Sequence, residues 1–428
     1  MCGGYDMIRK MTAVTCFIAA VTSIFITSQI IKTSAYHGQF CDEIHSEGYV
    51  VNYDVDQTDS ADDEEYGAEC VKTDGESLEL AAPCIYLCDY GTGTLIYAKN
   101  ENDRRPIASM TKIMLLILAF EQEEAGTLSF DETIKVSANA SGMGGSQVFL
   151  ETDGEYRAGE LIKSIIVSSA NDASVAIAER LFGSEKCAVN EMNAKAEAMG
   201  LKNTLFSNCT GLMKPTQYSS AKDVAAMLSE LIKHEKYFDY SRIYLDEITH
   251  SNDRKTMITN TNKLVKYYNG CDGGKTGFTN EAGFCLAATA KRGATRLVSV
   301  VIGEKDGKQR FADSAALFNY GFDNYSSKMV LSTESQEYQV EVKNGKQEYV
   351  FAVPENDLYV FGHNNVKENV QIVFEPADNV KAPIARGDKV GKFVLFKDDI
   401  KIGEYKATSF SSVGRLSYKD YLEQIASA

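Results

Sequence analysis

Ser109-Met110-Thr111-Lys112 is the stretch of this sequence that says most about its fold. The serine and the lysine stand three residues apart, directly before the apolar run Ile113–Phe120. At this spacing two side chains lie one turn apart on one face of a helix, so the lysine amine would lie beside the serine hydroxyl. An amine that is kept neutral can accept the proton of a serine and produce a nucleophile. The stretch therefore predicts a nucleophilic serine and its base at the start of a helix.

The same spacing occurs elsewhere, so Ser109 needs support from other segments. Ser219-Ser220-Ala221-Lys222 fits the serine–lysine pattern equally well. Ser109 is distinguished by two segments that follow it in order, Ser169-Ala170-Asn171 and Lys275-Thr276-Gly277. Ser137-Ala138-Asn139 has the same Ser-Ala-Asn sequence as the segment at Ser169, but it lies closer to Ser109 and lacks an equally clear helix break. We expect the three segments that begin at Ser109, Ser169 and Lys275 to meet in one cleft.

Two of these segments carry groups that suit proton transfer. A lysine that acts as a base needs a lowered pKa, which burial and a second cation nearby both produce. Lys275 can supply such a cation to Lys112. Ser169 and Asn171 fall at a break between two amphipathic helical runs, where they can provide a hydroxyl relay and an amide that holds a substrate.

The third segment suits the binding of a carboxylate. Lys275 and Thr276 offer a positive charge and a hydroxyl, which are the partners that a carboxylate takes. Gly277 has no side chain and lets a substrate backbone approach closely. Together they predict a substrate-binding strand edge.

The order of the expected elements places these segments in an α+β domain. Residues 80–325 read as two strands, a largely helical block, a strand hairpin and a final helix. This order favours an antiparallel sheet covered by helices over a βαβ repeat. Residues 326–415 are predicted to form a small all-β domain, with a short tail at 416–428. Its expected strands are Tyr338–Val342, Tyr349–Val353, Leu358–Phe361, Val370–Phe374 and Lys392–Phe396.

The N-terminus is expected to be a targeting segment. Arg9 and Lys10 precede the uncharged run Met11–Ile31, so residues 1–35 are predicted to be either a signal peptide or a membrane anchor. The two basic residues predict that the rest of the chain faces outward, in a secreted or membrane-anchored protein.

An acidic spacer is predicted at residues 36–79. Asp42–Glu76 holds thirteen acidic residues and one lysine, a composition that cannot bury enough apolar surface to fold. Most of the net charge of −16 therefore lies in this spacer, and nothing in the rest of the chain points to nucleic acid.

Other catalytic classes lack support in the sequence. None of the five histidines lies near a GxSxG elbow or in an HExxH motif, so a Ser-His-Asp triad is unsupported. The ten cysteines include no CxxC pair, and no nucleotide-binding glycine motif occurs in a strand–helix context. We expect neither a metal nor a cofactor.

The combined motifs resemble those of the penicillin-recognising serine enzymes, which carry S-x-x-K, S-x-N and K-T-G elements. Within that group the chain is most similar to the D-alanyl-D-alanine carboxypeptidases, the low-molecular-mass penicillin-binding proteins. The resemblance spans about residues 80 to 415 and includes a β-rich C-terminal domain. The matching segments are Ile107–Lys112, Met143–Leu150, Ser168–Ala173 and Gly273–Thr279.

The resemblance implies a covalent reaction on peptidoglycan. Ser109 would attack the peptide carbonyl between the two D-alanines that end a stem peptide, and Lys112 would be the general base. Ser169 would pass the proton to the leaving D-alanine, and Asn171 would position the substrate amide. Penicillin would acylate the same serine and leave slowly.

The resemblance also implies how the substrate is held. Lys275 and Thr276 would bind its terminal carboxylate, and the backbone N–H groups of Ser109 and Phe278 would form the oxyanion hole. Arg310 falls where the family keeps an arginine for the carboxylate, although the loop before it is variable. Phe278 replaces a histidine found in some relatives, but only its backbone N–H is required.

Two other functions stay open at this point. A β-lactamase on the same fold is one, but the Glu-x-x-Leu-Asn loop of class A enzymes is not found and the extra β-domain favours a carboxypeptidase. A non-catalytic penicillin-binding sensor or scaffold is the other, and it would need neither Lys112 nor Ser169. The C-terminal tail is short and balanced in charge, so membrane attachment is expected to depend on Met11–Ile31.

Overall fold

The computed structural model describes residues 78–250, 253–366 and 369–420. The predicted targeting segment at 1–35 lies outside the described residues, as does nearly all of the spacer predicted at 36–79. Within the described part of the chain, no helix is long and apolar enough to cross a membrane.

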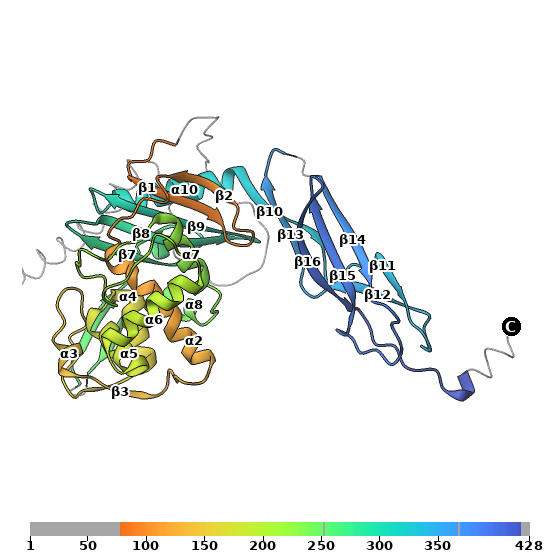
Figure 1. Ribbon diagram of the computed structural model, residues 1–428, viewed down its shortest axis with the longest axis horizontal. Helices are drawn as coiled ribbons and strands as arrows, with labels where there is room; N and C mark the ends of the chain where they lie inside the picture. The colour runs from red at the N-terminus through yellow and green to blue at the C-terminus, as the bar shows by residue number, and fades with distance from the viewer. Residues whose placement is uncertain (1–77, 251–252, 367–368, 421–428) are drawn as a thin grey trace, which may run out of the picture. The chain divides into compact units, whose positions relative to one another are not determined.

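The first sheet is formed by strands from both ends of the predicted peptidase region (Figure 1). Its order is β2-β1-β9-β8-β7, and every neighbouring pair is antiparallel. The bounds are β1 (Cys84–Asp89), β2 (Leu95–Lys99), β7 (Cys271–Thr279), β8 (Gly283–Arg292) and β9 (Thr295–Glu304). The pairing of β1 with β9 brings the N-terminal hairpin beside the C-terminal one, which leaves β7 at an edge of the sheet.

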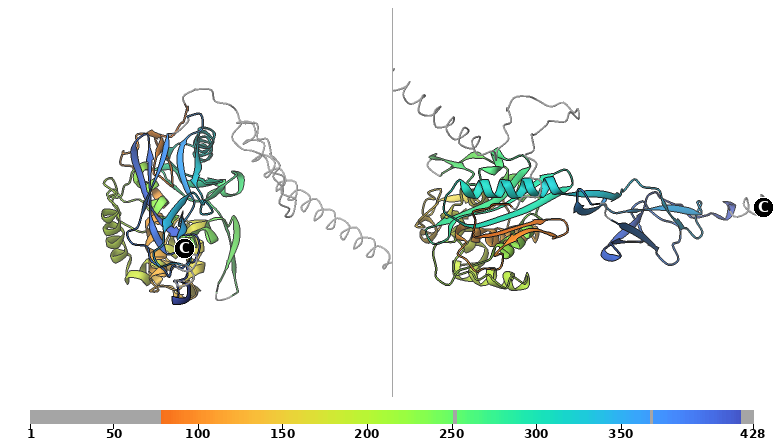
Figure 2. Two further views of the ribbon diagram at one scale, coloured as in Figure 1. Left: turned by 90° about the vertical axis from the view of Figure 1, so that its right-hand side faces the viewer. Right: turned by 90° about the horizontal axis from the view of Figure 1, so that it is seen from above.

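Helices cover both faces of this sheet. The central residues of β8 and β9 are all buried and mostly apolar, as expected for strands that are covered on both sides. On one face α10 (Gln309–Asn324) packs against β8 and β9, and on the other α7 (Ala221–Leu231) packs against the same strands (Figure 2).

The helical block lies between β2 and β7 in the chain. Its central helix is α2 (Lys112–Glu124), whose first nine residues are all buried, and the short 3-10 helix η1 (Ala108–Thr111) leads into it. The other helices are α3 (Ala138–Ser141), α4 (Ala158–Ser168), α5 (Asn171–Phe182), α6 (Glu185–Ala198), α8 (Tyr237–Ser241) and α9 (Leu264–Tyr267). Two small hairpins complete the block, β3 (Thr133–Lys135) with β4 (Glu155–Arg157) and β5 (Leu245–Thr249) with β6 (Lys255–Thr259).

The remaining strands form two sheets with a core of their own. A five-stranded sheet has the order β11-β12-β16-β15-β14, and β10 pairs with β13. Phe393, Leu395 and Val390 are fully buried in this core. The bounds are β10 (Tyr325–Leu331), β11 (Tyr338–Glu341), β12 (Tyr349–Pro354), β13 (Leu358–His363), β14 (Val370–Pro376), β15 (Lys389–Lys397) and β16 (Ile400–Ser409).

The predicted fold class, an α+β sheet with a helical block and an all-β C-terminal part, is confirmed. Two strands of the C-terminal part, β10 and β16, were not predicted, and neither were the small hairpins of the helical block, β3 with β4 and β5 with β6. β16 carries lysines and a glutamate, and its first seven residues are exposed or only partly buried, so its sequence lacks the apolar alternation of its neighbours. The sequence also predicts a helix over Ser219–His234. The observed helix α7 is shorter and begins only at Ala221, because Ser220 caps it by accepting the N–H of Asp223 at 3.2 Å.

Candidate active site

The serine and lysine of the first motif meet as predicted. Ser109 lies in η1, and Lys112 is the first residue of α2. The Lys112 Nζ atom lies 3.0 Å from Ser109 Oγ. It also donates to Asn171 Oδ1 at 2.7 Å and to the carbonyl oxygen of Thr210 at 2.5 Å. These contacts aim the amine at the serine hydroxyl.

Burial gives Lys112 the character of a base. Its side chain has no exposed surface, and this burial lowers its pKa to about 7. Burial, then the Lys112 amine and then Arg310 also hold the pKa of Lys275 well below its usual range. The sequence predicted that burial and the Lys275 cation together lower the pKa of Lys112. Burial lowers it, but the effect of one lysine on the other is seen at Lys275 and not at Lys112.

The second motif occupies a break between two helices, as predicted. Ser169 ends α4 in the left-handed conformation, with φ 63°, and its Oγ accepts a hydrogen bond from Lys275 Nζ at 2.7 Å. Asn171 begins α5 and donates from Nδ2 to the carbonyl oxygen of Gly144 at 2.7 Å. Because its Oδ1 accepts from Lys112, Asn171 links the first two motifs.

The third motif runs along β7, directly beside the serine. A Cβ atom on Gly277 would lie 2.5 Å from the carbonyl oxygen of Ile107 and 3.3 Å from the Ser109 nitrogen, so only glycine allows this approach. Thr276 is nearly buried on the same strand. Phe278 is half exposed, and its ring stacks on that of Phe284 with the centroids 4.2 Å apart.

Arg310 reaches the same strand from α10. Its Nη1 lies 3.3 Å from the carbonyl oxygen of Gly277 and 3.5 Å from that of Cys285. Burial lowers its pKa to about 10, and its Nε is buried without a hydrogen-bond partner among the described residues. The structure therefore brings a guanidinium beside the third motif, which the sequence alone left uncertain.

The two look-alike segments have structural roles elsewhere. Ser220 caps α7, and the Ser219 hydroxyl lies 2.8 Å from that of Thr204. Ser137 caps α3, and both Ser137 and Asn139 donate to the carboxylate of Glu179.

Two residues not identified from the sequence, Asp172 and Gly211, support the segments that carry the catalytic side chains. The carboxylate of Asp172 accepts the N–H groups of Val148 and Leu150 at 3.0–3.2 Å, which anchors a segment beside Asn171. Gly211, at φ +85°, packs so tightly that a Cβ there would lie 2.0 Å from the carbonyl oxygen of Ala108. Asp172 and Gly211 can be read in the sequence as an acidic residue and as a glycine that favours a turn. Nothing in the sequence shows which distant residues they contact.

The arrangement suits nucleophilic acyl transfer. A hydroxyl lies beside a buried amine of lowered pKa, and two further cations line the neighbouring strand. In the part of the chain that the structure describes, no cluster of His, Cys, Asp or Glu side chains is arranged to hold a metal ion.

Comparison with known proteins places this geometry in a family. Residues 71–306 match the D-alanyl-D-alanine carboxypeptidase family, and residues 325–415 match the C-terminal domain of penicillin-binding protein 5. The chain belongs to the D-alanyl-D-alanine carboxypeptidase family. The predicted family and enzyme class, a serine carboxypeptidase, are thereby confirmed.

The similarity to individual members of this carboxypeptidase family extends over most of the chain. It is 37% identical to D-alanyl-D-alanine carboxypeptidase DacF of Bacillus subtilis, over 82% of this chain and 92% of that protein. Penicillin-binding protein 5 of Haemophilus influenzae has a similar crystal structure, with a TM-score of 0.61 and 29% identity over 79% of this chain and 99% of that one. Penicillin-binding protein D2 of Listeria monocytogenes, solved in an ampicillin-bound form, has a TM-score of 0.52 and 29% identity over 58% and 100%.

Proposed function

We propose that this carboxypeptidase removes the terminal D-alanine from peptidoglycan stem peptides through an acyl-enzyme on Ser109. The observation that carries the proposal is the pair formed by Ser109 and Lys112, 3.0 Å apart, with the amine fully buried. A lysine in this setting is neutral in a large fraction of molecules at neutral pH, and only the neutral amine accepts a proton.

In the first step Lys112 Nζ takes the hydroxyl proton of Ser109. The Ser109 Oγ forms a bond to the carbonyl carbon between the two D-alanines, and the carbonyl oxygen becomes negatively charged. The backbone N–H groups of Ser109 and Phe278 would stabilise this oxyanion, since β7 passes close to the Ser109 nitrogen at Gly277.

Release of D-alanine needs a proton on its nitrogen as the C–N bond breaks. The Ser169 hydroxyl is the proposed relay: it gives its proton to this nitrogen and takes up in its place the proton that Lys112 removed from Ser109. Lys275 holds the Ser169 oxygen at 2.7 Å. The remaining product is an ester on Ser109. Water hydrolyses that ester, which returns the serine hydroxyl and frees the shortened peptide.

The terminal carboxylate of the substrate gives the site its specificity. Lys275 and Thr276 on β7, and Arg310, which reaches β7 from α10, carry the donors that a carboxylate takes. This recognition explains why the proposed cleavage removes a C-terminal residue.

A β-lactam would enter the same reaction as a false substrate. Its ring carbonyl would acylate Ser109, and the ester would hydrolyse slowly. The ampicillin-bound Listeria relative supports this expectation. We place the reaction at the outer face of the cytoplasmic membrane, where peptidoglycan lies. The predicted signal peptide or anchor at residues 1–35 would bring the enzyme there.

The direct test measures D-alanine released from a peptide that ends in D-Ala-D-Ala, together with covalent labelling by fluorescent penicillin. The wild type is expected to do both, and Ser109→Ala to do neither. Ser219→Ala, which alters the second serine–lysine spacing, is the matched control and should keep both. Labelling without D-alanine release would favour a sensor, and rapid turnover of penicillin would favour a β-lactamase.

A further inference from the structure

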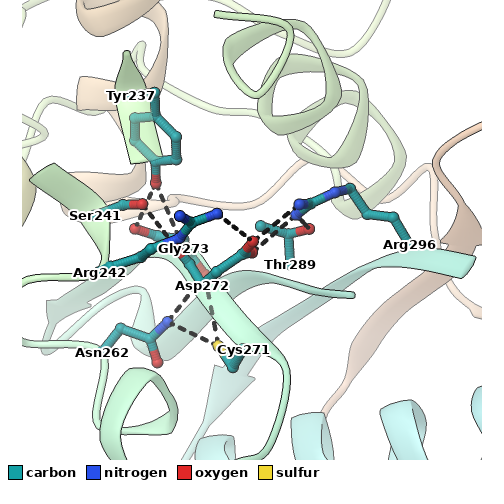
Figure 3. A network of polar contacts seen from close by, with 10 residues as sticks. Tyr237, Ser241, Arg242, Asn262, Cys271, Asp272, Gly273, Thr289 and Arg296 are labelled. Carbon is teal, nitrogen blue, oxygen red and sulfur yellow. Dashed lines mark hydrogen bonds and ion pairs between the residues drawn. The ribbon is translucent and has the colours of Figure 1, made fainter. Parts of the chain in front are cut away.

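We propose that Tyr237, Ser241, Asn262 and Arg296 form a clamp that positions Lys275 for catalysis by holding the Asp272–Gly274 stretch of β7. None of the four residues belongs to the three motifs. The inference rests on the proposed function, because it gives these residues a role through Lys275. Figure 3 shows the clamp around Asp272.

The first observation is a bulge in β7. Cys271 pairs with Ala290 and Gly273 pairs with Thr289, so two steps along β7 face one step along β8. Asp272 is therefore the extra residue. Side chains alternate between the faces of a strand, so the position of a bulge decides which face later residues present. Three residues after the bulge, about 10 Å along the strand, lies Lys275.

The second observation is that side chains bond the backbone at the bulge and at the two residues that follow it. Ser241 Oγ donates to the carbonyl oxygen of Asp272 at 2.5 Å, and Asn262 Nδ2 donates to that of Gly273 at 3.2 Å. The Tyr237 hydroxyl accepts the N–H of Gly274 at 2.9 Å. Because β7 is an edge strand, its outer side has no neighbouring strand to bond these backbone groups. The three side chains bond them instead.

The third observation is an ion pair that spans the sheet. The Asp272 carboxylate receives two hydrogen bonds from Arg296, at 2.8 and 2.9 Å, and Arg296 lies on β9. Its Nη1 also donates to Thr289 on the intervening strand at 3.0 Å. The pair ties β7 to β9 across β8, and both side chains are largely buried.

Gly273 and Gly274, the two residues before Lys275, leave the space that the clamp requires. A Cβ on Gly273 would lie 2.9 Å from Tyr237 Cε1, so a side chain there would displace the tyrosine ring. Gly274 has φ +136° and lies so near β8 that a Cβ would be 2.2 Å from the carbonyl oxygen of Ala287. The Gly-Gly step therefore exists to admit Tyr237 on one side and β8 on the other.

One contact in Figure 3 lies outside the clamp. The closest approach of Arg242 to the Asp272 carboxylate is 3.5 Å, and the Arg242 side chain, which lines a cavity of about 510 Å³, is 61% exposed. An ion pair of this length from a solvent-exposed guanidinium contributes little. Arg242→Ala is therefore expected to leave catalysis unchanged.

The clamp matters because Lys275 serves two purposes. It holds the Ser169 hydroxyl at 2.7 Å, and it is proposed to bind the substrate carboxylate. A shift of about 1 Å in a catalytic group can cost about 10²-fold in rate. Loosening the bulge should therefore slow acylation and weaken substrate binding together.

The test compares Tyr237→Phe with Tyr156→Phe. Both tyrosines are buried and use their hydroxyls in two contacts, but Tyr156 bonds the N–H of Glu151 and His250 Nδ1 rather than β7. Active sites are titrated with labelled penicillin, and the acylation rate, kcat and KM are expressed per active site. Tyr237→Phe should lower acylation and kcat at least tenfold and raise KM, whereas Tyr156→Phe and Arg242→Ala should stay within twofold of wild type.

Asp272→Asn provides a second variant should Tyr237→Phe not fold. Its control is Glu132→Gln, which changes the partly exposed ion pair that Glu132 forms with Arg180. Acylation and KM within twofold of wild type in either folded clamp variant would overturn the proposal. Failure of the proposed function is a separate result, because a wild type that releases no D-alanine still reports on the clamp through its rate of penicillin acylation.

Discussion

Lys112 offers the sharpest test of the reaction, because the proposed base must lose its proton before it can act. Burial lowers its pKa to about 7. An amine with this pKa is neutral in about half of the molecules at pH 7 and in about one in a hundred at pH 5. The rate of acylation by penicillin should therefore rise about tenfold per pH unit between pH 5 and 6 and level off above pH 8.

Lys112→Arg keeps a cation but removes the base. A guanidinium stays protonated in proteins, so acylation should fall by about 10² to 10⁴ and should not recover at pH 9. The assay follows fluorescent penicillin bound over time from pH 5 to pH 9, with folding checked by near-UV circular dichroism. Lys163→Arg is the control, since Lys163 is also nearly buried but forms ion pairs with Glu160 and Asp246 at 2.8 Å.

Two results would refute this reasoning. One is acylation that stays constant from pH 5 to pH 8. The other is a Lys112→Arg enzyme that acylates within tenfold of wild type. Either would mean that some other group takes the proton from Ser109.

Three further variants probe other parts of the account. Ser169→Ala should lower kcat about 10²-fold with a smaller change in KM, because it removes the proposed proton donor to the leaving group, and steady-state kinetics on a D-Ala-D-Ala peptide would measure this. Arg310→Ala should mainly raise KM for that peptide, and a peptide whose C-terminal carboxylate is amidated should bind both enzymes equally poorly. Burial and then Asp313 raise the pKa of Glu304 to about 8, so the folded protein holds a proton that the unfolded chain loses near pH 4.5. Stability should therefore fall as the pH rises from about 4.5 through 8, and thermal melts of Glu304→Gln should show a weaker decline over that range.

The three motifs could be predicted from the sequence because each combines a pattern of local structure, such as a helix start or a helix break, with residue types suited to catalysis or binding. A serine and a lysine three apart before an apolar run predict a helix start, and Ser109 and Lys112 indeed lie 3.0 Å apart at the entry to α2. The break before Asn171 was visible as an interruption between two amphipathic runs. Gly277 was expected to let a substrate backbone approach closely, whereas the close approach in the structure is to the protein's own backbone at Ile107 and Ser109.

Other parts of the site could not be predicted, because they depend on contacts between distant parts of the chain. The carbonyl oxygen of Thr210 bonds Lys112 across 98 residues, and a carbonyl has no sequence signature. Tyr237 and Asn262 are ordinary polar residues until the bulge at Asp272 gives them backbone groups to bond. The strand β16 was missed for a related reason, since its pairing with β12 and β15 stabilises a segment whose exposed side chains look like those of a loop.

The claim that the three motifs form one acylation centre on Ser109 is tested most directly by locating the covalent adduct. The enzyme would be incubated with penicillin, quenched in acid, digested and analysed by tandem mass spectrometry. The account predicts one penicilloyl group per molecule, attached to Ser109, and no adduct in the Ser109→Ala protein. An adduct on another residue, or release of D-alanine by Ser109→Ala at the wild-type rate, would contradict it.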